Sequence, residues 1–272
     1  MSTNRCDICI EEECKGTRDC NCDTCDKRDL CPKVLRPTIR VTCRCTQACS
    51  HCCYSCSPKR DEMMTPKMAG HVRRFLDNNN IDHITLMGGE VFCNPDWREV
   101  VATLAEGMGY VRLVTNGDWV GTAFLNDLAP YRAHMKISLS RDRWHTNEHV
   151  EAALAACEDA GFHHVVATPE EVTEDSVVPI GRGDLSYGFY STFGCFCQHP
   201  EHRYNFLIDE VGEIYKCGLG AWSYADIFEY AEGNFAPRFK EFNRIFWRTF
   251  ISNCRACLRT WERVKHEDRK GT

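Results

Sequence analysis

The segment Thr38-Ile-Arg-Val-Thr-Cys-Arg-Cys-Thr-Gln-Ala-Cys-Ser-His-Cys52 joins a β-like run to a tight group of cysteines. Its first five residues are rich in β-branched side chains and predict a strand. Cys45, Cys49 and Cys52 follow with the spacing Cys-x3-Cys-x2-Cys. Three such thiolates can ligate three irons of a cubane [4Fe–4S] cluster and leave the fourth iron open to a small molecule, whereas a ferredoxin cluster with four thiolates only transfers electrons. The spacing therefore indicates chemistry rather than electron storage.

Composition limits the possible classes of protein. The chain has 272 residues, of which 43% are hydrophobic, enough for one large domain with or without appendages. A formal net charge of -6 gives no general attraction to nucleic acid or to an anionic membrane. No apolar stretch approaches the ~18–20 residues of a membrane span, and the first residues lack the apolar segment of a secretory signal. We expect a cytoplasmic protein without a membrane partner; the sequence leaves its oligomeric state open.

Twenty cysteines are an extreme number for such a chain. Ten disulfides in a secreted protein would be one reading. The missing export signal speaks against it, because reducing compartments disfavour disulfides. The close Cys-x-Cys and Cys-x-x-Cys pairs fit metal ligation better.

Residues 1–35 form a cysteine-rich N-terminal extension with few apolar residues, so we expect no packed core there without bound metal or neighbouring protein. A possible N-terminal metal site consists of four of its seven cysteines, namely Cys6, Cys9, Cys22 and Cys25. These four could bind zinc or hold an additional iron–sulfur cluster. Free thiols or tag-like disorder are the remaining alternatives.

Residues 36–185 alternate strand and helix patterns. Short runs rich in Val, Ile, Leu or Thr predict strands at 38–43, 83–88, 110–115, 134–139, 163–168 and 176–180. Helices are predicted at 65–79, 96–108, 121–130 and 147–160. Thr65-Pro66 and Asn94-Pro95 look like a cap residue followed by proline in the first turn, and Gly161 like a helix stop. The alternation predicts an α/β fold, a partial (β/α)6 TIM-like barrel with six of the eight units of a full barrel.

Residues 186–272 change character. Residues 205–209 and 213–217 predict a hairpin that turns at Gly212. Two helix-like stretches follow, and then the pair Cys254-x2-Cys257. We expect a small C-terminal domain of hairpin and helix.

The cysteine segment resembles the CxxxCxxC signature of radical S-adenosylmethionine (SAM) enzymes. His51 lies where that family usually has an aromatic residue near the adenine of SAM. Gly88-Gly89-Glu90 after the second predicted strand looks like the family's GGE motif, which recognises the SAM amino group. Its glycines allow close backbone approach, and its carboxylate suits an ammonium group. Val91 replaces the proline that often follows in the family.

Further motifs follow other predicted strands. Asn116 belongs to a turn that resembles the family's TNG turn, and similar proteins use hydroxyls such as those of Ser138 and Ser140 on the SAM ribose. Arg182, after the sixth strand, could pair with the SAM carboxylate because its planar fork matches that group. Taken singly, each has a simpler explanation. Asn116 could belong to an ordinary turn, Ser138 could be a polar strand residue, and Arg182 could be a solvated loop residue. Together they fall at carboxyl ends of strands, where βα proteins place their sites, so the resemblance covers about residues 36–185.

The C-terminal third resembles the twitch domain of this superfamily, a shortened SPASM domain that holds an auxiliary cluster. The matching ligands would be Cys197, Cys217, Cys254 and Cys257, with Cys195 as a competitor for Cys197. A cluster with four thiolates has no open iron, so its role would be electron transfer. A structural Zn(Cys)4 site is the alternative.

The resemblance implies a [4Fe–4S] cluster charged by a one-electron reductant such as flavodoxin or ferredoxin, and an oxygen-sensitive enzyme. SAM bound to the open iron would be cleaved to methionine and a 5′-deoxyadenosyl radical, which abstracts a substrate hydrogen. The cofactor supplies the chemistry while the protein orients it and excludes water. An auxiliary cluster could accept an electron from the substrate radical, which would suit dehydrogenation or bond formation.

Cys93 and His145 lie just past strand ends and are candidate catalytic residues. Cys93 could donate a hydrogen atom or a proton, although a small packed thiol is the alternative. The twitch-like domain favours a peptide or protein substrate. The shortness of the chain and the basic residues of 255–270 leave a nucleobase, nucleotide or sugar-like metabolite as the second possibility. A non-catalytic, cysteine-rich metal-binding module is the third.

Overall fold

The computed structural model describes residues 35–52, 54–119, 122–141, 145–146, 148–167, 205–215, 223–235 and 237–238. Several predicted features lie outside these residues: the N-terminal extension with Cys6, Cys9, Cys22 and Cys25, the strand at 176–180, Arg182, Cys195, and the twitch-like ligands Cys197, Cys217, Cys254 and Cys257.

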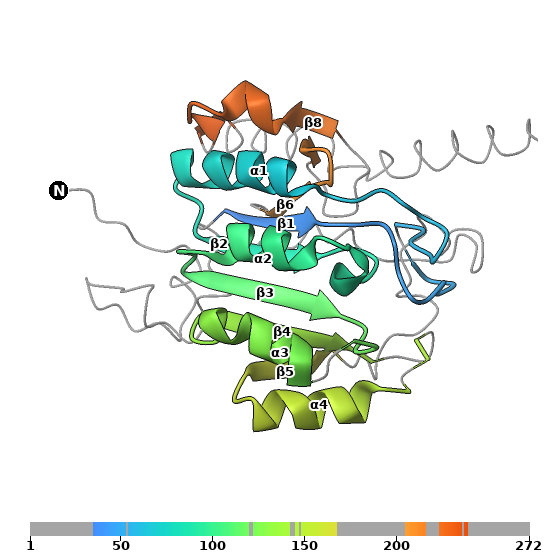
Figure 1. Ribbon diagram of the computed structural model, residues 1–272. Coiled ribbons are helices and arrows are strands. Elements are labelled where there is room, and N and C mark those ends of the chain that lie inside the picture. The colour runs from blue at the N-terminus through green and yellow to red at the C-terminus, as the bar shows by residue number, and fades with distance from the viewer. Residues whose placement is uncertain are drawn as a thin grey trace, which may run out of the picture.

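An eight-stranded sheet runs through the molecule in the order β5-β4-β3-β2-β1-β6-β7-β8 (Figure 1). Its strands are β1 (Arg36–Arg40), β2 (His83–Met87), β3 (Tyr110–Thr115), β4 (Met135–Ser140), β5 (His163–Ala167), β6 (Asn205–Ile208), β7 (Glu213–Tyr215) and β8 (Ser223–Asp226). β1 to β5 are parallel neighbours and β6 pairs with β1 in parallel, while β7 and β8 are antiparallel. The α/β class agrees with the sequence prediction, as do the bounds of the first five strands within three residues. Closure into a partial barrel stays a prediction.

The helices cover one face of this sheet (Figure 1). They are α1 (Pro66–Asn78), α2 (Trp97–Ala105), α3 (Thr122–Leu128) and α4 (Val150–Asp159), with the short 3-10 turns η3 (Val91–Cys93), η4 (Ala129–Tyr131) and η8 (Ile227–Tyr230). None of the helices within the described ranges is long and apolar enough to cross a bilayer.

Two of the three predicted helix signals are confirmed. Thr65 caps α1, because its side chain accepts a hydrogen bond from the amide of Met68 and a proline follows it. Gly161 ends α4 with a φ of 68°, a left-handed conformation that favours glycine.

The prediction that Asn94 caps α2 is wrong. Asp96 is the cap, and α2 begins one residue later. Asn94 is buried, and its side-chain amide donates to the carbonyl oxygens of Val41 and Met64 at 3.1 and 2.9 Å. Its Oδ1 accepts from the Asp96 amide at 2.9 Å, a local turn that resembles a cap in sequence.

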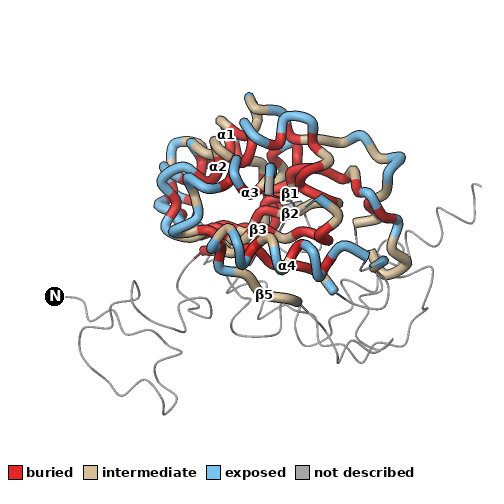
Figure 2. The backbone as a smooth tube through the Cα atoms, turned by 60° about the horizontal axis from the view of Figure 1, so that its bottom comes forward, coloured by how far each residue is buried: buried red, intermediate tan, exposed pale blue. Residues whose placement is uncertain are grey.

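The core lies between the sheet and the helices (Figure 2). Ile39, Leu86, Leu113 and Ile137 are register partners on successive strands and are 0–1% exposed. They belong to one hydrophobic cluster with α1 and α2 side chains such as Phe75. The alternate residues of each strand face the other side of the sheet.

The predicted hairpin forms between β6 and β7 and turns at Gly212, whose φ is 90°. The hairpin extends the main sheet, since Leu207 pairs with Thr38 of β1. At this junction the Arg40 guanidinium donates to both Glu210 carboxylate oxygens at 2.7 and 3.2 Å, and both side chains are largely buried.

Breaking this ion pair should destabilise the fold. We expect Arg40→Met to lower the free energy of unfolding by about 3–5 kcal/mol, because it leaves the Glu210 carboxylate buried without its cation. Arg40→Met/Glu210→Met should recover more than half of that loss. Urea denaturation measures the free energy of unfolding of both variants. The control is Arg98→Met, which breaks the exposed Arg98–Asp127 pair. It should lower the free energy of unfolding by less than about 1 kcal/mol. Equal losses for Arg40→Met and Arg98→Met would contradict the account.

Candidate functional site

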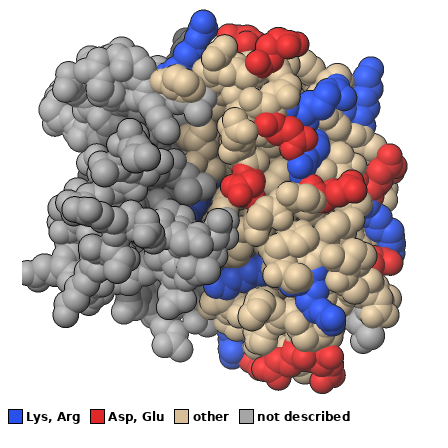
Figure 3. Space-filling model, turned by 90° about the vertical axis from the view of Figure 1, so that its left-hand side faces the viewer, with Lys and Arg blue, Asp and Glu red and all other residues tan. Residues whose placement is uncertain are grey.

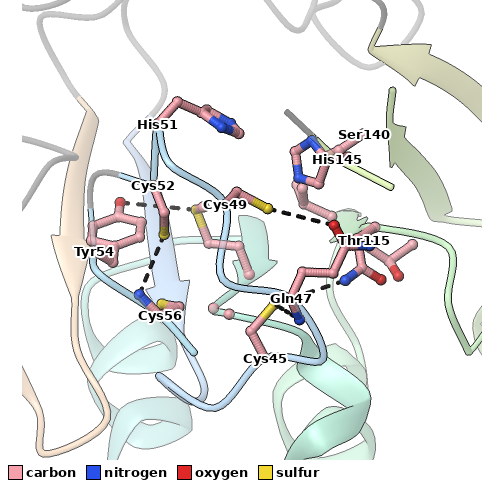
Figure 4. Close-up of a pocket in the computed structure, with 15 residues that line it drawn as sticks. Cys45, Gln47, Cys49, His51, Cys52, Tyr54, Cys56, Thr115, Ser140 and His145 are labelled. Carbon is pink, nitrogen blue, oxygen red and sulfur yellow. Dashed lines mark hydrogen bonds between the residues drawn. The ribbon is translucent and has the colours of Figure 1, made fainter. Parts of the chain in front are cut away.

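A pocket opens at the edge of the sheet where the parallel strands end (Figure 4). Ligands of open α/β sheets bind at this edge, because the loops that follow the strands meet there. The lining residues come from the loop after β1 and from the ends of β2, β3 and β4: Cys45, Gln47, Cys49, His51, Cys52, Tyr54, Cys56, Met87, Gly88, Gly89, Val114, Thr115, Asn116, Ser140 and His145.

The loop after β1 brings the three cysteines of the motif to this pocket (Figure 4). Cys45 is the most buried of them, and burial raises the pKa of its thiol to about 12. The amide of Gln47 donates to the Cys45 sulfur at 3.4 Å, and the Cys49 thiol donates to Gln47 Oε1 at 3.5 Å. The amide of Cys56 donates to the Cys52 sulfur at 3.3 Å. Each sulfur of the motif therefore has a polar contact within the loop.

The loop does not form a site for a single ion. In the described part of the chain, no three His, Cys, Asp or Glu side chains are arranged to hold one metal ion. The donor set suits the larger group that the spacing predicted, since three thiols share one pocket with glycines and polar side chains. In these respects the residues fit a three-thiolate cluster with a bound small molecule.

Gly88 and Gly89 let the turn after β2 approach the cysteine loop closely. The amides of Gly89 and Glu90 donate to the carbonyl oxygens of Thr42 and Arg44 at 2.8 and 2.9 Å. A Cβ on Gly89 would lie 2.7 Å from the carbonyl carbon of Arg44 and 2.8 Å from the Cβ of Cys45. Only glycine leaves room for this contact.

Glu90 is completely buried beside the pocket and is not among its lining residues. Its carboxylate accepts hydrogen bonds from the Thr115 hydroxyl at 2.9 Å and from the Asn116 amide at 2.8 Å. Burial raises the pKa of this carboxyl to about 7, against the opposing effect of these donors. The geometry gives Glu90 a structural contact that joins the ends of β2 and β3. Direct binding of a ligand by Glu90 stays a prediction.

Three of the other predicted cofactor residues line the pocket, and one is buried beside it. Asn116 lines the pocket, and its side-chain amide donates to Thr46 Oγ1 at 2.9 Å. Ser140 also lines the pocket, whereas Ser138 is fully buried and accepts from Arg112 at 2.9 Å. His51 also lines the pocket.

The two predicted catalytic residues lie apart. His145 lines the pocket, and its ring packs edge-on against that of His51 with centroids 5.1 Å apart (Figure 4). Cys93 ends η3, is half-buried and does not line the pocket. Burial raises the pKa of the Cys93 thiol to about 11, which matches the alternative of a packed thiol.

Sequence reasoning missed a polar network that joins three loops. The Gln47 side-chain amide donates to both Asp118 carboxylate oxygens at 3.1 and 3.0 Å and to Thr146 Oγ1 at 3.0 Å. Its Oε1 accepts from the Thr146 amide at 3.2 Å. Two sequence signals were available, because Gln47 lies between two motif cysteines and Asp118 directly follows the turn at Asn116-Gly117.

Comparisons with known proteins agree with this geometry. A model described as "Radical SAM superfamily" matches residues 39–175, slightly more than half of the chain. No curated protein matches the chain.

Two solved structures illustrate the shared fold. One is BtrN in complex with AdoMet and 2-DOIA, with a TM-score of 0.55 and 16% identity over 78% of this chain and 86% of that one. The other is native anSMEcpe with bound AdoMet and Cp18Cys peptide, with a TM-score of 0.51 and 14% identity over 82% and 89%. At such identity the likeness concerns the fold alone.

The close approach at Gly89 yields a test. We expect Gly89→Ala to displace the Cys45 backbone and to lower bound iron and sulfide in the purified protein by more than half, because the added methyl group meets backbone rather than a mobile side chain. Gly70→Ala is the matched control. Gly70 lies within α1 with open space at its Cβ, so this change should stabilise the protein by about 0.5–1 kcal/mol and leave iron unchanged. Unaltered iron in Gly89→Ala would disprove the proposed constraint.

Proposed function

The chain belongs to the radical SAM superfamily, and from this membership we propose that it cleaves S-adenosylmethionine at a [4Fe–4S] cluster held by Cys45, Cys49 and Cys52 to modify a peptide or protein side chain. The family implies both the cluster and S-adenosylmethionine, and its members are enzymes that need a reductant. The roles of individual residues and the substrate are the proposal.

One observation supports the site most strongly. Three cysteines of one loop share a pocket with Gly88, Gly89, Asn116 and Ser140, which come from three further strand ends. A purely structural group of thiols would not need polar side chains such as Asn116 and Ser140 beside an open pocket. Their convergence favours a cluster with a small molecule beside it.

When bound, the cluster and S-adenosylmethionine supply a one-electron cleavage that yields a carbon radical able to abstract hydrogen. The chain orients these groups. Gly88 and Gly89 line the pocket without side chains, while Asn116 and Ser140 offer an amide and a hydroxyl to the same space. The rings of His51 and His145 flank it. Arg182 remains a candidate for the carboxylate of S-adenosylmethionine on sequence grounds.

Further cofactor sites are proposed from the sequence. Cys197, Cys217, Cys254 and Cys257 would ligate an auxiliary cluster, and Cys6, Cys9, Cys22 and Cys25 would hold a third cluster or zinc. A flavodoxin- or ferredoxin-like protein would supply electrons. We expect the enzyme to work in the cytoplasm.

The peptide substrate rests on the twitch-like cysteine spacing. A protein of similar fold, anSMEcpe, has been solved with a peptide, whereas BtrN has been solved with the small molecule 2-DOIA. The fold accommodates both kinds of ligand, so substrate class must be tested directly.

The cluster assignment makes a specific prediction. Cys45→Ala, Cys49→Ala and Cys52→Ala should each lose about four irons per chain relative to wild type and all formation of 5′-deoxyadenosine under dithionite. Cys56→Ala is the control, because Cys56 lines the same pocket and its backbone amide contact to Cys52 survives the change. Cys254→Ala should also lose about four irons but still form 5′-deoxyadenosine. Cluster loss in Cys56→Ala together with retention in Cys52→Ala would refute the assignment.

The substrate class can be separated by one anaerobic assay. Wild type with reductant and S-adenosylmethionine is offered a pool of synthetic peptides in one reaction and a pool of nucleotides and sugar phosphates in another. We expect a mass change in a peptide together with extra 5′-deoxyadenosine, since hydrogen abstraction drives both. If only the pool of nucleotides and sugar phosphates were turned over, the substrate would be a nucleotide or sugar-like metabolite rather than a peptide.

A further inference from the structure

The face of the sheet that points away from the helices presents a row of polar side chains, closer to the start of the strands than the pocket. Thr38, Thr85, Arg112 and Lys136 are successive register partners on β1 to β4. They alternate with the core residues of their strands, such as Leu113 and Ile137, so they point away from the helices. The interior of a βα barrel is normally filled by branched apolar side chains. A polar row at this level therefore calls for an explanation.

Two members of this row are cations in direct register. Arg112 of β3 is the Cα partner of Lys136 on β4. Neighbouring strands are about 4.8 Å apart, so the two side chains leave the same face of the sheet close together. Like charges directly opposite each other destabilise a sheet. Both residues are also partly buried, which raises the cost of their charge.

No acidic group among the described residues compensates this pair. One Arg112 nitrogen donates to Ser138 Oγ at 2.9 Å, while its Nε is buried without a hydrogen-bond partner. Lys136 makes no hydrogen bond or ion pair with any of the described residues. The buried acids of the described residues are engaged elsewhere, because Asp209 and Glu210 pair with Arg40 and Glu90 accepts from the end of β3.

The general surface charge does not account for the pair either. The chain is net acidic. On the end of the molecule where the strands begin, basic and acidic side chains are interspersed over the described surface (Figure 3). Arg112 and Lys136 are thus a local concentration of positive charge on one face of the sheet.

This pair lies in line with the pocket. Val114 and Ser140 line the pocket and lie two and four residues beyond Arg112 and Lys136 on the same strands and the same face. At about 3.3 Å per residue, the cations lie ~7–13 Å below the level of the pocket. A molecule of several atoms could reach both places at once.

We propose that Arg112 and Lys136 bind an oxyanion of the substrate, a carboxylate or a phosphate, and hold the reacting part of that substrate toward the pocket. This inference rests on the proposed function and deepens it. The planar guanidinium of Arg112 can donate two parallel hydrogen bonds to such a group, and the Lys136 ammonium adds a point charge. The anion also removes the repulsion between the two cations. A peptide would present an acidic side chain, whereas a nucleotide or sugar would present its phosphate.

The test measures anion binding without turnover. Full-length protein with its cluster is heated in inorganic phosphate, in glutarate, or in chloride of equal ionic strength. We expect one of the two anions to raise the Tm of wild type by about 2–4 °C over chloride. Lys136→Met and Arg112→Met should reduce this shift below about 1 °C, whereas Lys59→Met, at an exposed turn, should keep it. A larger shift with glutarate indicates a carboxylate substrate, and a larger shift with phosphate indicates a phosphorylated one.

A further variant, Lys136→Glu, tests the repulsion between the two cations directly. Lys136→Glu would pair with Arg112, so it should raise the Tm in chloride and abolish the anion effect. Equal anion shifts in wild type and all variants would overturn the inference, as would a lower Tm of Lys136→Glu in chloride. Neither result depends on cleavage of S-adenosylmethionine. Failure of the proposed function would instead appear as wild type that forms no 5′-deoxyadenosine.

Discussion

The close backbone contact between the turn at Gly88-Gly89 and the segment Thr42–Cys45 determines the geometry of the site. Two amide-to-carbonyl hydrogen bonds fix the turn after β2 against the start of the cysteine loop. Because a side chain on either glycine would meet backbone atoms there, the contact exists only with glycine at both positions. The position of Cys45 thus depends on β2 as much as on its own strand.

Glu90 extends this constraint to β3. Its carboxylate is buried, and a buried charge costs free energy unless donors compensate it. The Thr115 hydroxyl and the Asn116 amide are those donors, so the turn after β2 and the end of β3 hold each other in place. From there Asn116 reaches Thr46, and Gln47 reaches Asp118 and Thr146. A continuous polar network therefore surrounds the cysteine loop on the side of β3 and β4.

Local sequence patterns predicted much of this fold and left its long-range contacts open. Short β-branched runs located the first five strands, since burial on the sheet selects such residues. Asn94 misled the prediction because an Asx turn and a helix cap use the same side chain. The pairing of β6 with β1 joins segments far apart in sequence, which no local pattern reveals. Gln47 and Asp118 were missed for the same reason, because their side chains form a hydrogen bond across 71 residues of sequence. Among the described residues that the motifs named, all line the pocket except Glu90, Ser138 and Cys93, which lie beside or below it. Arg182 and the cysteines of the other two predicted metal sites lie outside the described residues.

We propose that the pocket formed by the cysteine loop and the ends of β2 to β4 holds a cluster with S-adenosylmethionine beside it. The most direct measurement is the electron paramagnetic resonance spectrum of the dithionite-reduced protein before and after addition of S-adenosylmethionine. We expect the signal of the reduced cluster to change shape when S-adenosylmethionine is added, because this molecule would bind at the cluster itself. An unchanged spectrum from protein with a full complement of iron would contradict it.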